Sequence, residues 1–144
     1  MFEEKEEFIK DLILLVFLSL SNVYERTYLQ KIFFLIENEL FKEIDLNYIN
    51  YNYGPFSKDL QLYVNELKKM NLIDEKITKT GEHETHVFTL TDDGKKVAEK
   101  VRKENVSNYE KINKYCNKFK DHTPSELLRF VYSKYPEWTV KLQF

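Results

Sequence analysis

The chain has 144 residues, of which 42% are hydrophobic and 32% charged, and this composition predicts one soluble domain with a real core. Its aromatic load (11 Phe, 10 Tyr, 1 Trp) excludes a disordered chain, and three Gly with three Pro exclude collagen-like and linker-rich classes. The net charge of −2 lacks the strongly basic footprint of a protein that works on the nucleic-acid backbone. The single Cys excludes an internal disulfide and suits a reducing compartment, which we expect to be the cytoplasm.

Charge is distributed unevenly along the chain. Residues 1–56 hold five basic and ten acidic side chains, whereas residues 57–144 hold seventeen and fourteen. The basic excess concentrates between Lys95 and Lys120, with nine basic and three acidic residues. We therefore expect an acidic first half and a local basic face on the second half.

Apolar residues spaced three and four apart predict a first helix over residues 4–20. Its apolar run Leu12–Leu18 has seven residues, whereas a bilayer span needs about 18 or more. The preceding residues, including Glu3 and Glu4, have the wrong charge for a signal peptide. We expect no membrane segment here, and instead a helix buried on most of its faces.

A second amphipathic helix is predicted from Thr27 onward. Thr27–Gln30 has the form of a capping box, with a Thr hydroxyl for a free amide and a Gln three residues later. Apolar residues from Leu29 to Leu40 share one face of this helix. The other, exposed face is expected to show Lys31, Glu37 and Glu39.

The spacing of apolar residues then changes from a helical pattern to the alternation of a strand. Residues 47–53 alternate in a way that suits a short half-buried strand, which Gly54–Pro55 is expected to end. Ser57 is a good N-cap for a third helix ending near Met70, with Leu60, Val64 and Leu67 as its core stripe. The polar residues expected on its exposed side are Lys58, Asp59, Gln61, Asn65, Glu66 and Lys68.

A β-hairpin follows the third helix. Leu72–Ile73 begins an extended segment, Gly81 marks a turn, and Thr85–Leu90 alternates as a second strand. Thr91 then caps a helix that opens with two acidic residues. Helix, turn, helix, hairpin and helix is the order of a winged helix-turn-helix. The predicted fold is therefore mainly α with a small β-hairpin, a winged helix-turn-helix with additional C-terminal helices.

The C-terminal residues predict two further helices. The first carries apolar residues in steps of three, four and three, the seam of a coiled-coil-like contact. This candidate dimer seam consists of Tyr109, Ile112, Cys116 and Phe119. The last helix has a capping box at Thr123–Glu126, and Pro136 ends it. The seam either forms a homodimer or packs in cis on the helix beginning at Pro124.

No repeat or low-complexity linker divides the chain. We expect a single domain over residues 1–144, made of a winged-helix core (1–101) and a C-terminal helical extension (102–144). The apolar stripe positions of the predicted elements define the expected core. These are Leu12, Val16, Leu29, Ile32, Phe33, Ile36, Leu60, Val64, Leu67, Phe88 and Leu90.

The sequence contains no motif for catalysis. His83 and His86 lie on the hairpin, far in sequence from Cys116 and His122, and no spacing matches a zinc signature. Cys116 lies on the apolar stripe, where a thiol is poorly activated. There is no Gly-rich phosphate loop and no nucleophile elbow. We therefore predict no catalytic residue, no metal, no cofactor and no enzymatic activity.

Binding of duplex DNA would use the third helix and the hairpin. The helix offers side chains to a major groove, and the hairpin offers lysines to phosphates. These candidate macromolecule-binding residues are Lys58, Gln61, Asn65, Lys68, Lys69, Lys76 and Lys79. Asp59 and Glu66 on the same helix oppose a phosphate field, and the helix contains no Arg. A solvated helix face with mixed charge explains the pattern equally well.

Aromatic residues gather just before the third helix. They are Tyr48, Tyr51, Tyr53 and Phe56. Stacking on nucleic-acid bases is one interpretation, but packing on a neighbouring helix is the commoner role of such a cluster. A partly exposed Tyr group would instead suit a protein interface.

Two segments resemble a known family. Thr27–Ile32 (TYLQKI) and Tyr53–Leu60 (YGPFSKDL) are similar to the paired motifs of Panacea-type proteins, which comprise antitoxins and phage-associated prokaryotic relatives. The resemblance covers about residues 27–101. Phe88–Lys95 (FTLTDDGK) also resembles the wing and following helix of prokaryotic winged-helix regulators. The family resemblance implies a non-enzymatic intracellular protein that binds another macromolecule.

The sequence thus favours a non-enzymatic, antitoxin-like regulatory module that acts by binding a protein, such as a toxin. The acidic first half and the Arg-free third helix support this function. The alternative is a dimeric winged-helix regulator that binds duplex DNA, supported by the fold itself and by the basic stretch Lys95–Lys120. A membrane partner is not expected.

Overall fold

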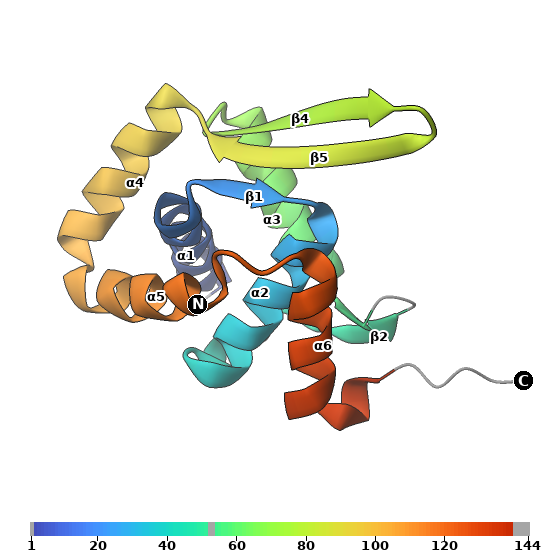
Figure 1. The fold of residues 1–144 in the computed structure, drawn as a ribbon. Coiled ribbons are helices and arrows are strands. Elements are labelled where there is room, and N and C mark those ends of the chain that lie inside the picture. The colour runs from blue at the N-terminus through green and yellow to red at the C-terminus, as the bar shows by residue number, and fades with distance from the viewer. Residues whose placement is uncertain (1, 52–53, 140–144) are drawn as a thin grey trace, which may run out of the picture.

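The computed structural model describes residues 2–51 and 54–139, and it is mainly helical with small antiparallel sheets (Figure 1). The elements in chain order are α1 (Phe2–Leu20), β1 (Asn22–Tyr24), α2 (Arg26–Glu39), η1 (Lys42–Ile44), β2 (Ile49–Tyr51), β3 (Gly54–Phe56), α3 (Lys58–Lys69), β4 (Ile73–Thr80), β5 (His83–Leu90), α4 (Asp92–Glu104), α5 (Val106–Phe119), α6 (Pro124–Lys134) and η2 (Pro136–Trp138). Among the described residues, no helix has the length and apolar character needed to cross a membrane.

The core is built around α1, whose residues from Leu12 to Phe17 are all buried. Helices α3, α4 and α5 pack against α1, so nearly every face of this helix is covered (Figure 1). All the core residues predicted from the sequence, from Leu12 to Leu90, are buried. This agreement follows from helical periodicity, because residues that share a stripe on a helix also share its buried side.

The predicted capping box at the start of α2 is wrong. The helix begins at Arg26, the preceding Glu25 has a φ of 76°, and no side chain caps the first turn. Thr27 therefore already lies inside the helix. The Gln30 amide is used elsewhere, because its Nε2 donates to the carbonyl of Ser57 at 2.9 Å.

The main sheet has three strands in the order β1-β5-β4, all antiparallel. The hairpin β4–β5 matches the prediction, with Ile73 paired to Leu90 and Thr80 to His83 around the turn at Gly81. Sequence analysis missed the edge strand β1, in which buried Val23 pairs with Phe88. Three residues with one apolar side chain are too short a pattern to predict a strand.

The segment before α3 differs from the prediction. Of the described residues in the range 47–51, Ile49–Tyr51 forms a strand, and all three residues are exposed, not half-buried. Gly54–Pro55 does not end the pairing, since Gly54–Phe56 is the second strand of the hairpin β2–β3. Gly54 pairs with Tyr51 and has a positive φ of 89°, which glycine adopts without strain. Asn52 and Tyr53 lie outside the described residues.

The predicted caps of α3, α4 and α6 are present. Ser57 Oγ accepts from the Leu60 amide at 3.0 Å and donates to the Leu46 carbonyl at 2.5 Å. Thr91 Oγ1 accepts from the Gly94 amide at 2.9 Å. Thr123 and Glu126 form the predicted capping box at the start of α6. Each cap satisfies a free amide of the first turn. Because the cap and the amide are three residues apart, a short sequence motif is enough to predict the helix start.

The C-terminal helices pack on the N-terminal half, with α5 against α1 and α6 against α2. Ile112, Cys116 and Phe119 of the candidate dimer seam are buried within one chain, and Tyr109 packs beside them. Phe119 also contacts Phe130 of α6, with ring centroids 4.9 Å apart. Packing in cis therefore already covers this seam, and a homodimer stays a prediction that would need another surface.

Candidate functional site

The predicted binding residues of α3 are partly engaged in contacts within the chain. Lys58 and Lys69 are exposed. Gln61 Nε2 donates to Asn65 Oδ1 at 3.2 Å, so each amide partly satisfies the other. Lys68 Nζ lies 2.6 Å from Glu75 Oε1 on β4. An ion pair thus connects α3 to the hairpin, and it uses Lys68, one of the predicted binding residues.

Glu75 is the centre of a charge cluster beneath the hairpin. Its side chain is only 2% exposed, yet it accepts from Arg26 at 3.0 Å, Lys68 at 2.6 Å and His86 at 2.7 Å. Burial by itself would raise the pKa of Glu75, but the hydrogen bonds from Lys68, His86 and Arg26 outweigh it and lower the pKa. These hydrogen bonds therefore stabilise the fold at this point. Sequence analysis did not single out Glu75, because its partners are brought together only by folding.

The two predicted hairpin lysines differ in their surroundings. Lys79 Nζ lies 3.5 Å from Glu84 Oε1, an exposed pair of the kind that contributes little stability. Lys76 is exposed. Among the predicted binding residues, the lysines least engaged in ion pairs are therefore Lys76 of the hairpin and Lys58 and Lys69 of α3.

The segments 27–32 and 53–60, which the sequence singled out as motifs, meet in the structure. Gln30 and Ser57 form a reciprocal buried pair, in which the Ser57 amide donates to Gln30 Oε1 at 2.8 Å. One residue further along α2, Lys31 Nζ donates to the Pro55 carbonyl at 3.1 Å. Gly54 lets α6 pack closely on β3, since a Cβ there would lie 2.7 Å from Leu128 Cδ1. The motif residues therefore hold α2, β3 and α6 together.

Lys31 is buried, which corrects the expectation that it lies on the exposed face of its helix. Only 3% of the residue is exposed, because β3 and α6 cover the face that the helical pattern leaves polar. Burial lowers the pKa of Lys31 to about 8. Among the described residues, no carboxylate lies within ion-pair distance of its ammonium group.

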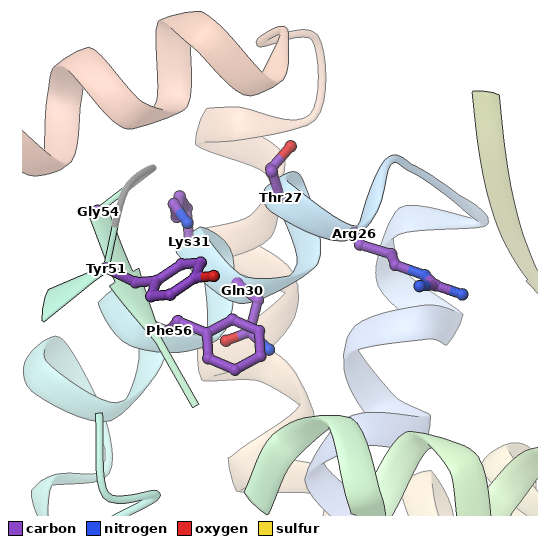
Figure 2. Close-up of a pocket in the computed structure, with 7 residues that line it drawn as sticks. All are labelled: Arg26, Thr27, Gln30, Lys31, Tyr51, Gly54 and Phe56. Carbon is purple, nitrogen blue, oxygen red and sulfur yellow. The ribbon is translucent and has the colours of Figure 1, made fainter. Parts of the chain in front are cut away.

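A pocket of about 150 Å³ opens beside Lys31 (Figure 2). Its lining residues are Arg26, Thr27, Gln30, Lys31, Tyr51, Gly54 and Phe56. Tyr51 and Phe56 form the aromatic wall, with ring centroids 5.8 Å apart. Figure 2 shows Lys31 next to the ring of Tyr51, whereas the side chain of Arg26 points away. A second, smaller pocket shares Thr27 and Lys31 and is completed by the start of α6.

The comparison with known families matches residues 29–139, more than half of the chain, to the family described as antitoxin SocA-like, Panacea domain. The chain belongs to this Panacea antitoxin family. No curated protein and no solved structure matches the chain. The matched range includes Lys31, Tyr51 and Phe56 of the pocket. Membership supports a regulatory, antitoxin-like role, suggests a non-enzymatic one, and implies in general that a toxin is the partner.

Cys116 and His86, two further titratable groups of this Panacea-family chain, are engaged within the fold. Burial raises the pKa of the Cys116 thiol to about 12, so the thiol stays protonated and is a poor nucleophile. No group of His, Cys, Asp and Glu in residues 2–51 and 54–139 could hold a metal ion. His86 is held by Glu75 in the charge cluster. The pocket at Lys31 is therefore the best candidate for a functional site.

Proposed function

We propose that the chain is an antitoxin-like regulatory module that acts by binding a protein toxin. One observation carries this proposal: the two segments that resemble Panacea motifs line one pocket, at which Lys31 is buried and no carboxylate of the described residues pairs with it. A pocket that is merely part of the core would be filled by apolar side chains. This pocket opens to the surface beside exposed Tyr51.

We also propose that the core is a winged helix-turn-helix. The order of α1, β1, α2, α3, β4 and β5 supports this architecture, as does the pairing of the short strand β1 with β5. In this interpretation β4–β5 is the wing, and η1, β2 and β3 are an insertion between the two helices of the motif. The insertion is the part that supplies Tyr51, Gly54 and Phe56 to the pocket.

The surface of the hairpin β2–β3 suits a protein partner. Ile49 and Tyr51, two residues apart on β2, are 57% and 53% exposed and present apolar surface on one face of the strand. Tyr is enriched at protein interfaces and often dominates their binding energy. The exposed side chains next to the pocket therefore extend the proposed toxin-binding surface.

Co-expression with candidate toxins tests this function. Reading frames adjacent to the gene are expressed in a heterologous host, and the chain is expected to bind one of them and restore growth. The double variant Ile49→Ser/Tyr51→Ser should lose the protection, whereas Leu62→Ser should keep it. Leu62 is the matched control because it is 51% exposed but lies on α3. Equal loss with both variants, or no neighbour bound at all, would contradict the proposal.

The alternative function is duplex DNA binding by a dimeric winged-helix regulator. The position of α3 against β4 favours this alternative. A helix and a wing placed in this way would contact the major groove of DNA and the phosphates beside it. With Lys68 engaged by Glu75, few lysines are left for phosphate contacts, so binding should be weak and fall steeply as salt rises. Titration against random duplexes tests this. One enriched motif, abolished by Gln61→Ala or Asn65→Ala, would favour the alternative.

A homodimer, a cytoplasmic location and the division of the chain near residue 101 stay predictions of the sequence. Light scattering tests the first of these. The seam of α5 is already buried within one chain, so it should not join two chains. If this seam were the only predicted interface, the protein should have a monomer mass at high concentration. A dimer mass would call for an interface elsewhere, such as the exposed hairpin β2–β3.

A further inference from the structure

Lys31 is unusual among the cations of this chain. The other lysines and arginines seen in ion pairs, such as Lys10 with Glu66 and Lys134 with Glu39, are partly or largely exposed. Lys31 is 3% exposed, and within residues 2–51 and 54–139 its ammonium group donates to a neutral carbonyl, that of Pro55, and pairs with no carboxylate. A buried charge without a counter-charge is costly, so proteins seldom retain one that has no use.

The surroundings of Lys31 would complement an anion. The hydroxyl-bearing residues Thr27 and Ser125 line the smaller pocket with it, in the first turns of α2 and α6. Helix starts carry partial positive charge, which adds to the field of the ammonium group. On the other side of Lys31, Tyr51 and Phe56 supply an apolar wall.

We propose that Lys31 binds a carboxylate of the protein partner, an acidic side chain whose apolar neighbour packs against Tyr51 and Phe56. This inference rests on the proposed function and identifies the chemistry of the toxin segment that enters the pocket. A phosphate group is a poorer match, because Arg26 is held by Glu75 and cannot join Lys31 in a multidentate site.

The charge state of Lys31 fits this role. With a pKa of about 8, the ammonium form still predominates at pH 7. A bound carboxylate would favour that form further and raise the pKa, because an opposite charge stabilises the protonated lysine. The pKa of Lys31 is therefore a direct signal of occupancy, which does not depend on knowing the toxin.

An NMR titration with phenylacetate, an aromatic carboxylate, tests the site in the intact chain. The neutral phenylacetamide and inorganic phosphate are the comparison probes. Phenylacetate is expected to shift the amide signals of Lys31 and Gly54, to raise the pKa of Lys31, and to bind at least about tenfold more tightly than either comparison probe. Equal binding of phenylacetate and phenylacetamide would overturn the proposal, and so would tighter binding of phosphate.

The variant Lys31→Met removes the charge and keeps the apolar stem. It should lose at least about tenfold in phenylacetate affinity, while the exposed-lysine control Lys42→Met keeps the affinity of the unmodified chain. Because Lys31→Met removes an uncompensated buried charge, it should melt no lower than the unmodified chain. Unchanged phenylacetate binding by a folded Lys31→Met variant would show that the carboxylate does not bind at Lys31.

The toxin, once identified by co-expression, separates this inference from the proposed function. Lys31→Met should weaken toxin binding at least about tenfold. If toxin binding survives in Lys31→Met but is lost in Ile49→Ser/Tyr51→Ser, the chain binds a protein and the carboxylate proposal is wrong. If phenylacetate binds at Lys31 but no toxin is found, the proposed function fails and the carboxylate must come from a small molecule instead of a protein.

Discussion

Glu75 and Lys31 are both withdrawn from solvent, but only Glu75 is surrounded by groups of opposite charge. Three basic side chains converge on its carboxylate, from α2, α3 and β5. Lys31 donates to the Pro55 carbonyl and, in the part of the chain that the structure describes, has no carboxylate partner, and a pocket lies beside it. The first arrangement is complete without a partner, so it serves the fold. The second offers a contact to a partner, which is why we propose Lys31 as the functional site; the predicted binding residues of α3 stay a prediction.

The largest expected effect comes from a substitution in the core face of α2, the helix that carries Lys31. Phe33 lies two residues further along α2 and is fully buried, at 0% exposure. Phe33→Ala should lower the free energy of unfolding by about 3–5 kcal/mol, because it removes apolar contacts and leaves a cavity. Urea denaturation measures this change. Ile49→Ala is the exposed control, and a Phe33→Ala variant as stable as that control would refute the assigned face of α2.

The variant Glu75→Gln should have an intermediate effect. It leaves Arg26, Lys68 and His86 without their shared carboxylate, at a cost of about 2 kcal/mol at pH 7, less than for a fully dry site because Arg26 is 50% exposed. The pKa of Glu75 is lowered in the fold, so its stabilisation is present above the ordinary Glu pKa and is lost as the pH falls through the folded value.

Denaturation of the two proteins as a function of pH measures that contribution. The difference in unfolding free energy between the unmodified chain and Glu75→Gln should be largest near neutral pH and shrink in acid. Glu99→Gln is the matched control, since its pair with Arg102 lies on α4, is exposed and includes no member of the Glu75 cluster. A difference that stays constant from neutral pH down into strong acid would mean that Glu75 is not the charged centre of its cluster.

The smallest expected effect has the opposite sign. Lys31→Met should raise the unfolding free energy by about 1–2 kcal/mol at pH 7, because each unit of pKa shift corresponds to about 1.4 kcal/mol and the lost hydrogen bond offsets part of the gain. The pKa of Lys31 is lowered to about 8, so the unfolded chain binds the proton more tightly. Stability of the unmodified chain therefore rises as the pH increases from about 8 toward the ordinary Lys pKa.

Comparing both proteins over this pH range isolates the contribution of Lys31, because all other groups titrate alike. The advantage of Lys31→Met should disappear at high pH, where Lys31 is neutral in both folded and unfolded chains. A Lys31→Met variant that is less stable than the unmodified chain at pH 7 would mean that the ammonium group supports the fold. The contrast with Glu75 would then be lost.

Local features of the fold could be predicted from the sequence. The caps Ser57, Thr91 and Thr123 act on amides three residues away, so their signal lies within one turn of chain. The candidate site could be predicted only in part. The motif segments around Gln30 and Ser57 were recognised, but the predicted binding residues lay on α3 and the hairpin, and Lys31 was expected on a solvated face.

The sequence by itself determined the helical stripes, the buried core, the hairpin β4–β5 and the family resemblance, since periodicity and short motifs are properties of neighbouring residues. Only the tertiary structure decided which charges are compensated. Lys31 meets Pro55 across 24 positions of the chain, and Arg26 meets Glu75 across 49. Whether a polar residue of an amphipathic helix meets water, a carboxylate or an empty pocket depends on the elements that pack over it, and the helical pattern carries no information about them.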